Sequence, residues 1–256
     1  MGSPVAAAPW SRYSRGVMAA NHVLLVHGAW HGAWCWDRVL KPLRELGMTP
    51  HTVDLPGHGE STVPLGDMHG DADAVKAALD AIDAPTLLVG HSYGGMVITD
   101  AGIHEGVTGV VYVCAFMPAA GSTLMDEGPG QTLPDGVTPN EPAPVAFTDD
   151  SMALSFDPAG APAALYHDCD EATQRWAAAR LDLQPTASFA EPARSLAYEY
   201  KPSAYVVCTD DRTIHPWNQR RMAARASRRD ELGASHSPFL SMPNELSQLI
   251  AGYQPR

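Results

Sequence analysis

Short apolar segments alternate along this chain with segments whose apolar residues recur every three or four positions. The apolar segments predict buried strands at 22–26, 86–89, 107–116 and 203–208, and further short strands are predicted at 49–55 and 230–233. The periodic segments predict helices at 37–46, 71–82, 96–101, 217–226 and 238–252. Because parallel strands need crossover helices, this alternation predicts an α/β fold with a mostly parallel sheet and helices on both of its faces.

The segment 118–195 interrupts this alternation. It is rich in proline and lacks a continuous apolar strand, while helical spacing is found at 161–167 and 171–181. We therefore predict that 118–195, termed the cap segment, is a mainly helical cap. It would be inserted into a core formed by 21–117 and 196–256.

Composition limits the partners of the protein. Its 256 residues are 45% hydrophobic, which suits a single domain with a sizeable core. The net charge of −12 would repel phosphate backbones, so no nucleic-acid partner is expected. The chain has no apolar run of about 18 residues, so no membrane span is expected either.

The first residues and the cysteines bear on localisation. Residues 1–20 are rich in alanine, serine, proline and arginine, and they lack an apolar run long enough for a signal peptide. We expect them to form a disordered extension. The four cysteines have no paired spacing, which favours buried reduced thiols over disulfides and therefore a cytoplasmic protein.

The segment 86–101 carries the most informative chemical motif. An apolar strand runs into Gly-x-Ser-x-Gly at 90–94, and a helical pattern follows. Strand, sharp turn and helix around this motif are typical of a nucleophile elbow, in which the serine hydroxyl is exposed on a strained turn. Glycine at 90 and 94 would let the strand and helix approach closely. Ser92 is therefore the predicted nucleophile.

A serine hydroxyl needs a base, and the base needs an acid that orients it. In chains with this elbow, the acid and then the histidine follow the serine. Asp210 and Asp211 directly follow the predicted strand at 203–208, and His236 lies in the loop after 230–233. We predict His236 as the base and Asp211 as the acid. Asp210 remains the alternative, because both carboxylates lie at the same strand end.

The oxyanion of an ester intermediate needs backbone N–H donors. The predicted donors are the N–H groups of Tyr93, directly after the nucleophile, and of Ala29, in the loop after the first strand. Other polar residues are expected to be structural. Hydrogen-bonding roles are expected for His27, His31, His58 and His91. The polar cluster at 166–169 could contact substrate, but helix capping by Asp168 or Asp170 is the favoured role here.

Metal and cofactor motifs are not apparent. The histidines are scattered, and neither His-Glu-x-x-His nor Cys-x-x-Cys occurs. The glycines around Ser92 fit neither a dinucleotide fingerprint nor a P-loop. We therefore expect no metal and no cofactor.

Several motifs together resemble those of a known family. The segment 27–36, His-Gly-Ala-Trp-His-Gly-Ala-Trp-Cys-Trp, is similar to the opening loop of the plant methylesterase and hydroxynitrile lyase group and of its bacterial esterase relatives. Further matching motifs are found at 54–59, 90–95, 207–211 and around His236. In related loops the acid lies three residues before an aliphatic residue, as Asp211 does before Ile214.

The resemblance implies an α/β-hydrolase fold with an inserted cap, and cofactor-free hydrolysis of small carboxylic esters by Ser92, His236 and Asp211. Hydroxynitrile lyases of this group carry Thr and Lys where this chain has Gly28 and Ser237, so lyase activity is not favoured. Lactone, thioester or carbon–carbon bond hydrolysis on the same residues remains open. So does a ligand-binding protein with little turnover, and the oligomeric state is not predicted.

Apolar side chains could form a substrate pocket above Ser92. The candidates are Trp30, Phe116, Met117, Leu124, Met125, Phe147, Phe156 and Trp176. Between 118 and 192 the cationic residues are Arg175 and Arg180, which share one helical pattern, so no site for an anionic substrate is expected. A small uncharged or aromatic ester is therefore the expected partner.

Overall fold

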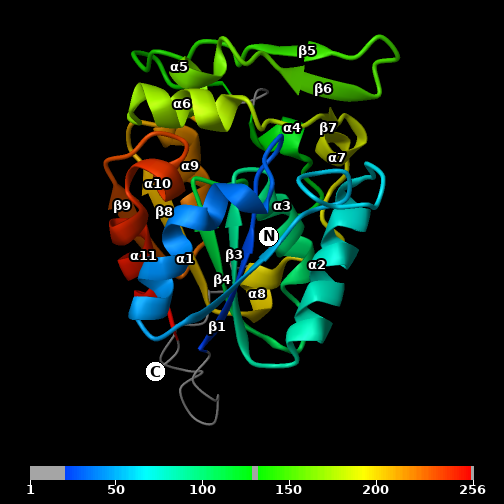
Figure 1. The fold of residues 1–256 in the computed structure, drawn as a ribbon, viewed down its shortest axis with the longest axis vertical. Coiled ribbons are helices and arrows are strands. Elements are labelled where there is room, and N and C mark those ends of the chain that lie inside the picture. Colours follow the sequence, from blue (N-terminus) through cyan, green and yellow to red (C-terminus); the bar gives the residue numbers. More distant parts are fainter. Residues whose placement is uncertain (1–20, 129–131, 255–256) are drawn as a thin grey trace.

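The structure, a computed structural model, describes residues 21–128 and 132–254 (Figure 1). Six strands form a sheet in the order β2-β1-β3-β4-β8-β9, and all neighbouring pairs are parallel, as predicted. The strands are β1 (His22–Val26), β2 (Thr49–Val53), β3 (Thr86–His91), β4 (Val107–Val113), β8 (Ser203–Cys208) and β9 (Arg228–Leu232). The predicted extension at 1–20 lies outside the described residues.

Helices cover both faces of this sheet (Figure 1). One layer consists of the 3-10 helix η2 (Ala33–Trp36), α1 (Asp37–Glu45), α10 (Pro238–Ser241) and α11 (Pro243–Gly252). The other layer consists of α2 (Met68–Ile82), α3 (Gly94–Ala101), α8 (Ala197–Tyr200) and α9 (Pro216–Ala223). Within β1, Leu24 and Val26 face the second layer, whereas Val23 and Leu25 face the first.

The prediction of one helix at 238–252 is wrong, because the chain forms α10 and α11 instead. Met242 lies between them with φ −133° and ψ 51°, outside the helical region. The reason is Pro243, whose ring disfavours helical dihedrals in the preceding residue and whose nitrogen carries no hydrogen to continue the ladder.

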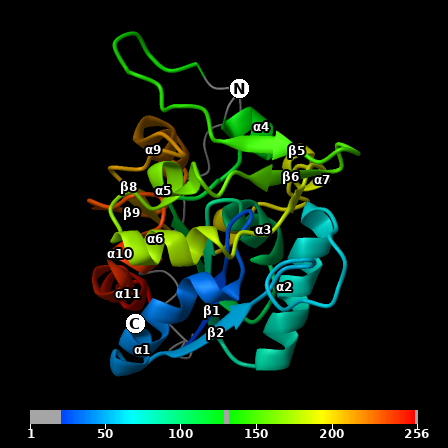
Figure 2. The ribbon, with the colours of Figure 1, turned by 45° about the horizontal axis from the view of Figure 1, so that its top comes forward.

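The cap segment lies above the carboxyl ends of the sheet strands (Figures 1 and 2). Its helices are α4 (Leu124–Glu127), α5 (Ala161–Leu165), α6 (Glu171–Ala178) and α7 (Ala187–Ala190). It also contains β5 (Val145–Phe147), β6 (Ala153–Phe156) and β7 (Gln184–Pro185), which form an antiparallel sheet. These strands were not predicted from the sequence, since strands this short show no apolar alternation and Pro185 argues against one.

Two features predicted from the sequence were buried, unpaired cysteines and the lack of a membrane span. Cys35, Cys114 and Cys208 are buried and free, as predicted, whereas Cys169 is free but only partly buried. Within 21–128 and 132–254, no helix combines the length and apolar character needed to cross a membrane.

Candidate active site

Ser92 lies in the sharp turn between β3 and α3. Its backbone φ is +51°, in the left-handed region that non-glycine residues rarely adopt. The turn is held by hydrogen bonds from the Ser92 N–H to the Val113 carbonyl (3.3 Å) and from the Phe116 N–H to the Ser92 carbonyl (3.0 Å). A Cβ at Gly94 would lie 2.5 Å from the His27 carbonyl oxygen, so this position requires glycine. Packing therefore maintains the strained turn predicted from the sequence motif.

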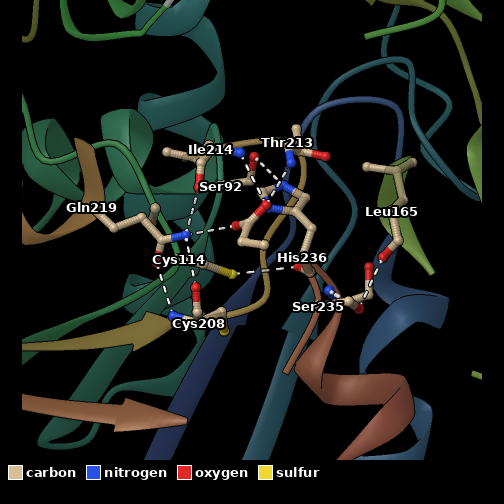
Figure 3. A network of polar contacts seen from close by, with 12 residues as sticks. Ser92, Cys114, Leu165, Cys208, Thr213, Ile214, Gln219, Ser235 and His236 are labelled. Carbon is tan, nitrogen blue, oxygen red and sulfur yellow. Dashed lines mark hydrogen bonds and ion pairs between the residues drawn. The ribbon is translucent and has the colours of Figure 1, made fainter. Parts of the chain in front are cut away.

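Ser92, His236 and Asp211 form one hydrogen-bonded chain, of which Ser92 and His236 are labelled in Figure 3. His236 Nε2 lies 3.0 Å from Ser92 Oγ, and His236 Nδ1 lies 2.7 Å from Asp211 Oδ2. The three residues are 7%, 2% and 2% exposed, respectively. Such an arrangement lets the imidazole take the serine proton while the carboxylate fixes the orientation of its ring.

Asp211 is held by donors from the following loop and from α9. Its Oδ1 accepts hydrogen bonds from the backbone N–H groups of Thr213 (2.7 Å) and Ile214 (2.9 Å), and its Oδ2 accepts one from Gln219 Nε2 (2.7 Å). Gln219 is fully buried and also contacts the Cys208 backbone (Figure 3). Gln219 is not recognisable from the sequence, because its place in a helical pattern does not distinguish it from a solvent-facing position.

The alternative acid, Asp210, occupies a different environment. Its side chain is exposed, and its backbone N–H donates to the Ala234 carbonyl. The structure therefore brings Asp211, and not Asp210, to His236.

The loop after β1 packs directly on the elbow. A Cβ at Gly28 would lie 2.7 Å from His91 Nδ1 and 2.8 Å from Ser92 Cβ, so only glycine fits between this loop and the turn. Ala29, the next residue, is buried. Tyr93 directly precedes α3, where N–H groups of the first turn have no acceptor within the helix. Ala29 directly follows Gly28, and Tyr93 directly follows Ser92. The two predicted oxyanion donors therefore lie next to the two residues that meet at the elbow.

The histidines expected to be structural are buried and hydrogen-bonded. His31 Nδ1 lies 2.8 Å from the Ala29 carbonyl oxygen, and His91 Nε2 lies 2.8 Å from the His236 carbonyl oxygen. Burial lowers the pKa of His31 to about 4 and holds the pKa of His91 well below its ordinary value. Both rings are therefore neutral at neutral pH, which suits hydrogen-bonding partners in the core.

One group of possible metal ligands occurs in the described part of the chain. Ligand atoms of His91, Cys114 and His236 lie within 4.8 Å of one another. The Cys114 thiol donates to the same His236 carbonyl that His91 approaches (3.4 Å). His91 and Cys114 thus pack against the backbone of His236. We assign these contacts a structural role rather than a role in metal binding.

The side chain of Tyr93 reaches a buried carboxyl group in α2. Its hydroxyl donates to Asp71 Oδ2 (2.5 Å), and Asp71 is 2% exposed. Burial raises the pKa of Asp71 to about 7, despite the opposing hydrogen bond from Tyr93. The neutral carboxyl is therefore favoured in the folded protein. The stability that this preference gives the fold is fully present below the ordinary pKa of an aspartate and is lost as the pH rises through about 7.

Asp71→Asn is expected to stabilise the protein more at pH 8 than at pH 5, because asparagine accepts the Tyr93 hydrogen bond without ionising. The difference in the free energy of unfolding should be about 2 kcal/mol in favour of the variant at the higher pH. Denaturant unfolding at both pH values measures it. Asp149→Asn, on an exposed residue, is the control. An equal effect of Asp71→Asn at both pH values would show that Asp71 does not titrate in this range.

Three consecutive cap-segment residues bind core loops around the site: the loop after β1 and the two loops that carry Asp211 and His236. The hydroxyl of Tyr166 lies 2.8 Å from His31 Nε2, and His167 Nε2 lies 2.8 Å from the Asp210 carbonyl oxygen. Asp168 Oδ2 accepts a hydrogen bond (2.8 Å) from the N–H of Ser235, which directly precedes His236. Burial acts to raise the pKa of Asp168, but the hydrogen bonds from Ser235, together with the nearby Ser241 and His167, leave the pKa below its ordinary value.

The predicted capping role therefore belongs to Asp170, whose side chain accepts from the Thr173 N–H (2.7 Å) at the start of α6. Asp168 does not cap a helix and instead fixes the loop of His236. Sequence spacing alone could not separate these roles, since the partner of Asp168 is distant along the chain.

Asp168→Ala is expected to lower kcat for an ester by roughly tenfold, because the Ser235 N–H loses a charged acceptor and the His236 loop loosens. Asp168→Asn keeps an acceptor and should retain most of the activity. Asp170→Ala is the matched control, since it removes a helix cap worth about 1 kcal/mol without touching that loop. Steady-state kinetics on the three variants would contradict this role for Asp168 if both alanine variants lost the same activity.

The predicted pocket residues fall into different environments. Phe116, Met117, Leu124 and Phe156 are buried, and Trp30 packs edge-to-face on Phe156 with ring centroids 5.1 Å apart. Trp176 instead packs on Trp34. Met125 and Phe147 are 47% and 67% exposed, so the structure does not bring them into the buried group. Met125 lies on a one-turn helix, and Phe147 lies on β5, whose three residues are all exposed.

Phe189 was not predicted as part of this group. It lies on α7 and packs against both Trp30 and Tyr93, with ring centroids 5.8 Å apart in each pair. Its segment carried no recognisable helical pattern, so the sequence offered no signal for it.

Comparisons with known proteins identify the family of the chain. Esterase PIR7B from Oryza sativa subsp. japonica is 27% identical over 90% of this chain and 94% of the rice protein. A carbendazim hydrolyzing esterase from Nocardioides sp. (strain SG-4G) is 40% identical over 41% of this chain and 46% of that protein. The solved structure of a pyrethroid hydrolase from Sphingobium faniae JZ-2 has a TM-score of 0.76 and 26% identity, over 91% of this chain and 96% of that chain. Residues 23–249 match the family model described as the alpha/beta hydrolase family, and the chain therefore belongs to this family.

Proposed function

We propose that this protein hydrolyses small, mainly uncharged carboxylic esters through an acyl-enzyme intermediate on Ser92. Its relatives include proteins named as esterases, and the chain is a carboxylic ester hydrolase. The observation that carries the proposed mechanism is the buried chain of hydrogen bonds from Asp211 through His236 to Ser92.

The reaction would begin with attack of Ser92 Oγ on the ester carbonyl carbon, while His236 Nε2 takes the serine proton. The carbonyl oxygen becomes an oxyanion, which accepts hydrogen bonds from the N–H groups of Ala29 and Tyr93. Collapse of this intermediate breaks the bond to the alcohol, and His236 returns the proton to the leaving oxygen. Water then attacks the acyl group with His236 again as base, which releases the acid and restores Ser92.

The charges of the cap segment support an uncharged substrate. Arg175 forms an exposed ion pair with Glu171 (3.2 Å), and the Arg180 guanidinium stacks on the ring of Trp176. Arg194, the third arginine of the cap segment, pairs with Asp73 and with the buried Asp100. All three arginines of the cap segment are thus engaged in other contacts. The buried side chains of Phe116, Met117, Leu124 and Phe156 offer apolar surface instead.

A series of aryl esters tests the substrate class. We expect kcat/KM for neutral acetate and butyrate esters to exceed that for the hemisuccinate ester of the same phenol by at least about tenfold, because the carboxylate would be desolvated without a cationic partner. A preference for the hemisuccinate would contradict an uncharged substrate. Turnover of lactones or thioesters at higher kcat/KM would instead favour the alternative reactions on the same triad.

Two other proposals concern organisation and location. The position of 118–195 over the strand ends supports its assignment as a cap on a core formed by 21–117 and 196–256 (Figure 2). The unpaired cysteines support a cytoplasmic location. The lyase alternative is not proposed, since Ser237, where those lyases carry Lys, offers no cation to a leaving cyanide.

A further inference from the structure

Trp30 follows the proposed oxyanion donor Ala29 and has an unusual backbone conformation. Its φ is +62°, a left-handed value that costs on the order of 1 kcal/mol or more in a bulky residue. Such a conformation persists only when neighbouring groups maintain it. Ala29 and Trp30 share a planar peptide unit, so a partner that fixes the Trp30 N–H also fixes the Ala29 carbonyl. This restricts rotation of the Ala29 backbone, which carries the proposed N–H donor on its other side.

All three hydrogen-bonding groups of Trp30 are bound by the cap segment. The Trp30 N–H donates to Gln184 Oε1 (3.2 Å), and the Trp30 carbonyl accepts from the Asp182 N–H (2.8 Å). The indole Nε1 donates to the Leu154 carbonyl (3.0 Å). The ring also packs edge-to-face on Phe156 and Phe189, which belong to the same segment.

Gln184 is the side chain through which this contact is made. It lies on β7 and is completely buried. Its Nε2 donates to Ser188 Oγ (2.7 Å), and Ser188 Oγ in turn donates to the Pro185 carbonyl (2.7 Å). This chain of donors fixes the amide so that Oε1 faces Trp30. The same oxygen lies 3.1 Å from Nε2 of the buried His58, which adds a second contact with the core.

We infer that Gln184 is a positioning residue through which the cap segment holds Trp30, and with it the Ala29 N–H, in the geometry of the oxyanion hole. The inference rests on the proposed function. It implies that the cap segment contributes to catalysis beyond covering the substrate, because displacement of β7 would release Trp30 and disorganise the hole. Gln184 itself need not touch the substrate.

Three variants test this inference. Gln184→Met removes the acceptor at similar volume, and Gln184→Glu keeps an oxygen facing Trp30. Thr186→Val is the matched control, since among the described residues the Thr186 hydroxyl binds only cap-segment carbonyls, at Ser151 and Met152. Each variant is assayed for kcat and KM with an aryl acetate and for inhibition by an aryl trifluoromethyl ketone. Addition of Ser92 Oγ to that ketone produces an oxyanion without a leaving group.

Loss of a complete oxyanion donor lowers kcat by roughly 10²–10³-fold, so a misaligned one should cost about 10–100-fold in Gln184→Met. KM should change little, and affinity for the trifluoromethyl ketone should fall by a similar factor. Gln184→Glu should retain clearly more activity than Gln184→Met, and Thr186→Val should stay within about twofold of the wild type. Amide hydrogen exchange should rise at 28–31 in Gln184→Met while β3 stays protected.

Equal kcat in Gln184→Met and Thr186→Val would overturn the inference, and so would a loss of kcat without loss of ketone affinity. If Gln184→Met does not fold, amide hydrogen exchange of the wild-type protein tests the inference instead. Rapid exchange of the Trp30 amide would show that Gln184 does not hold this N–H group. A wild type without ester turnover would reject the proposed function. An active wild type with an unaffected Gln184→Met variant would reject only the role of Gln184.

Discussion

Ser92→Ala is expected to lower kcat for an aryl ester by at least about 10⁴-fold, because no other hydroxyl is hydrogen-bonded to His236 among the described residues. Alanine keeps the Cβ that packs on Gly28 and has the same strain as serine at φ +51°, so stability should change little. The loss would therefore report on chemistry rather than on folding. A small residual rate is compatible with an oxyanion hole that stays assembled.

The measurement is steady-state turnover of an aryl acetate, with circular dichroism to establish that the variant is folded. A folded Ser92→Ala protein with turnover near that of the wild type would show that ester cleavage occurs elsewhere on the molecule. A wild type without turnover would instead favour the ligand-binding alternative.

Asp211→Asn is expected to lower kcat by about 10⁴-fold, because an asparagine amide can leave His236 in the wrong tautomer for accepting the serine proton. Asp211 Oδ2 lies 2.7 Å from His236 Nδ1, and its other oxygen is held by two backbone N–H groups. These two N–H groups should hold the substituted side chain in place while the proton transfer fails. An Nδ2 at the position of Oδ2 would lose the hydrogen bond from Gln219.

Asp210→Asn is the matched control at the adjacent position. Its carboxylate is exposed and its backbone alone binds neighbouring residues, so kcat should stay within about threefold of the wild type. Steady-state kinetics on both variants compares the two candidate acids directly. A larger loss in Asp210→Asn than in Asp211→Asn would assign the acid to Asp210.

The sheet and the elbow could be predicted because their signals are local. Strands buried on both faces appear as apolar runs, and the strand–turn–helix around Ser92 is contained within a few residues. The choice between Asp210 and Asp211 depended on side-chain direction at the end of β8, which spacing alone could not settle. In the structure that direction is fixed by Thr213, Ile214 and Gln219.

The cap segment was less predictable for physical reasons. Its strands are very short, and their pairing joins residues far apart in sequence, as in the contact of Leu154 with Gln184. The roles of Asp168 and Gln184 arise from contacts with loops of the core, so no local sequence pattern indicates these roles. The structure therefore adds most to the sequence for the polar residues of the cap segment, whose partners the sequence does not reveal.

The central claim is that Ser92 is a nucleophile activated by His236. Intact-mass spectrometry after incubation with a fluorophosphonate probe tests it most directly, because only an activated serine displaces the fluoride and becomes phosphonylated. We predict one adduct per wild-type chain, located at Ser92 by peptide mapping, and none on Ser92→Ala. Absence of an adduct on folded wild-type protein, or an adduct that persists in Ser92→Ala, would contradict the account.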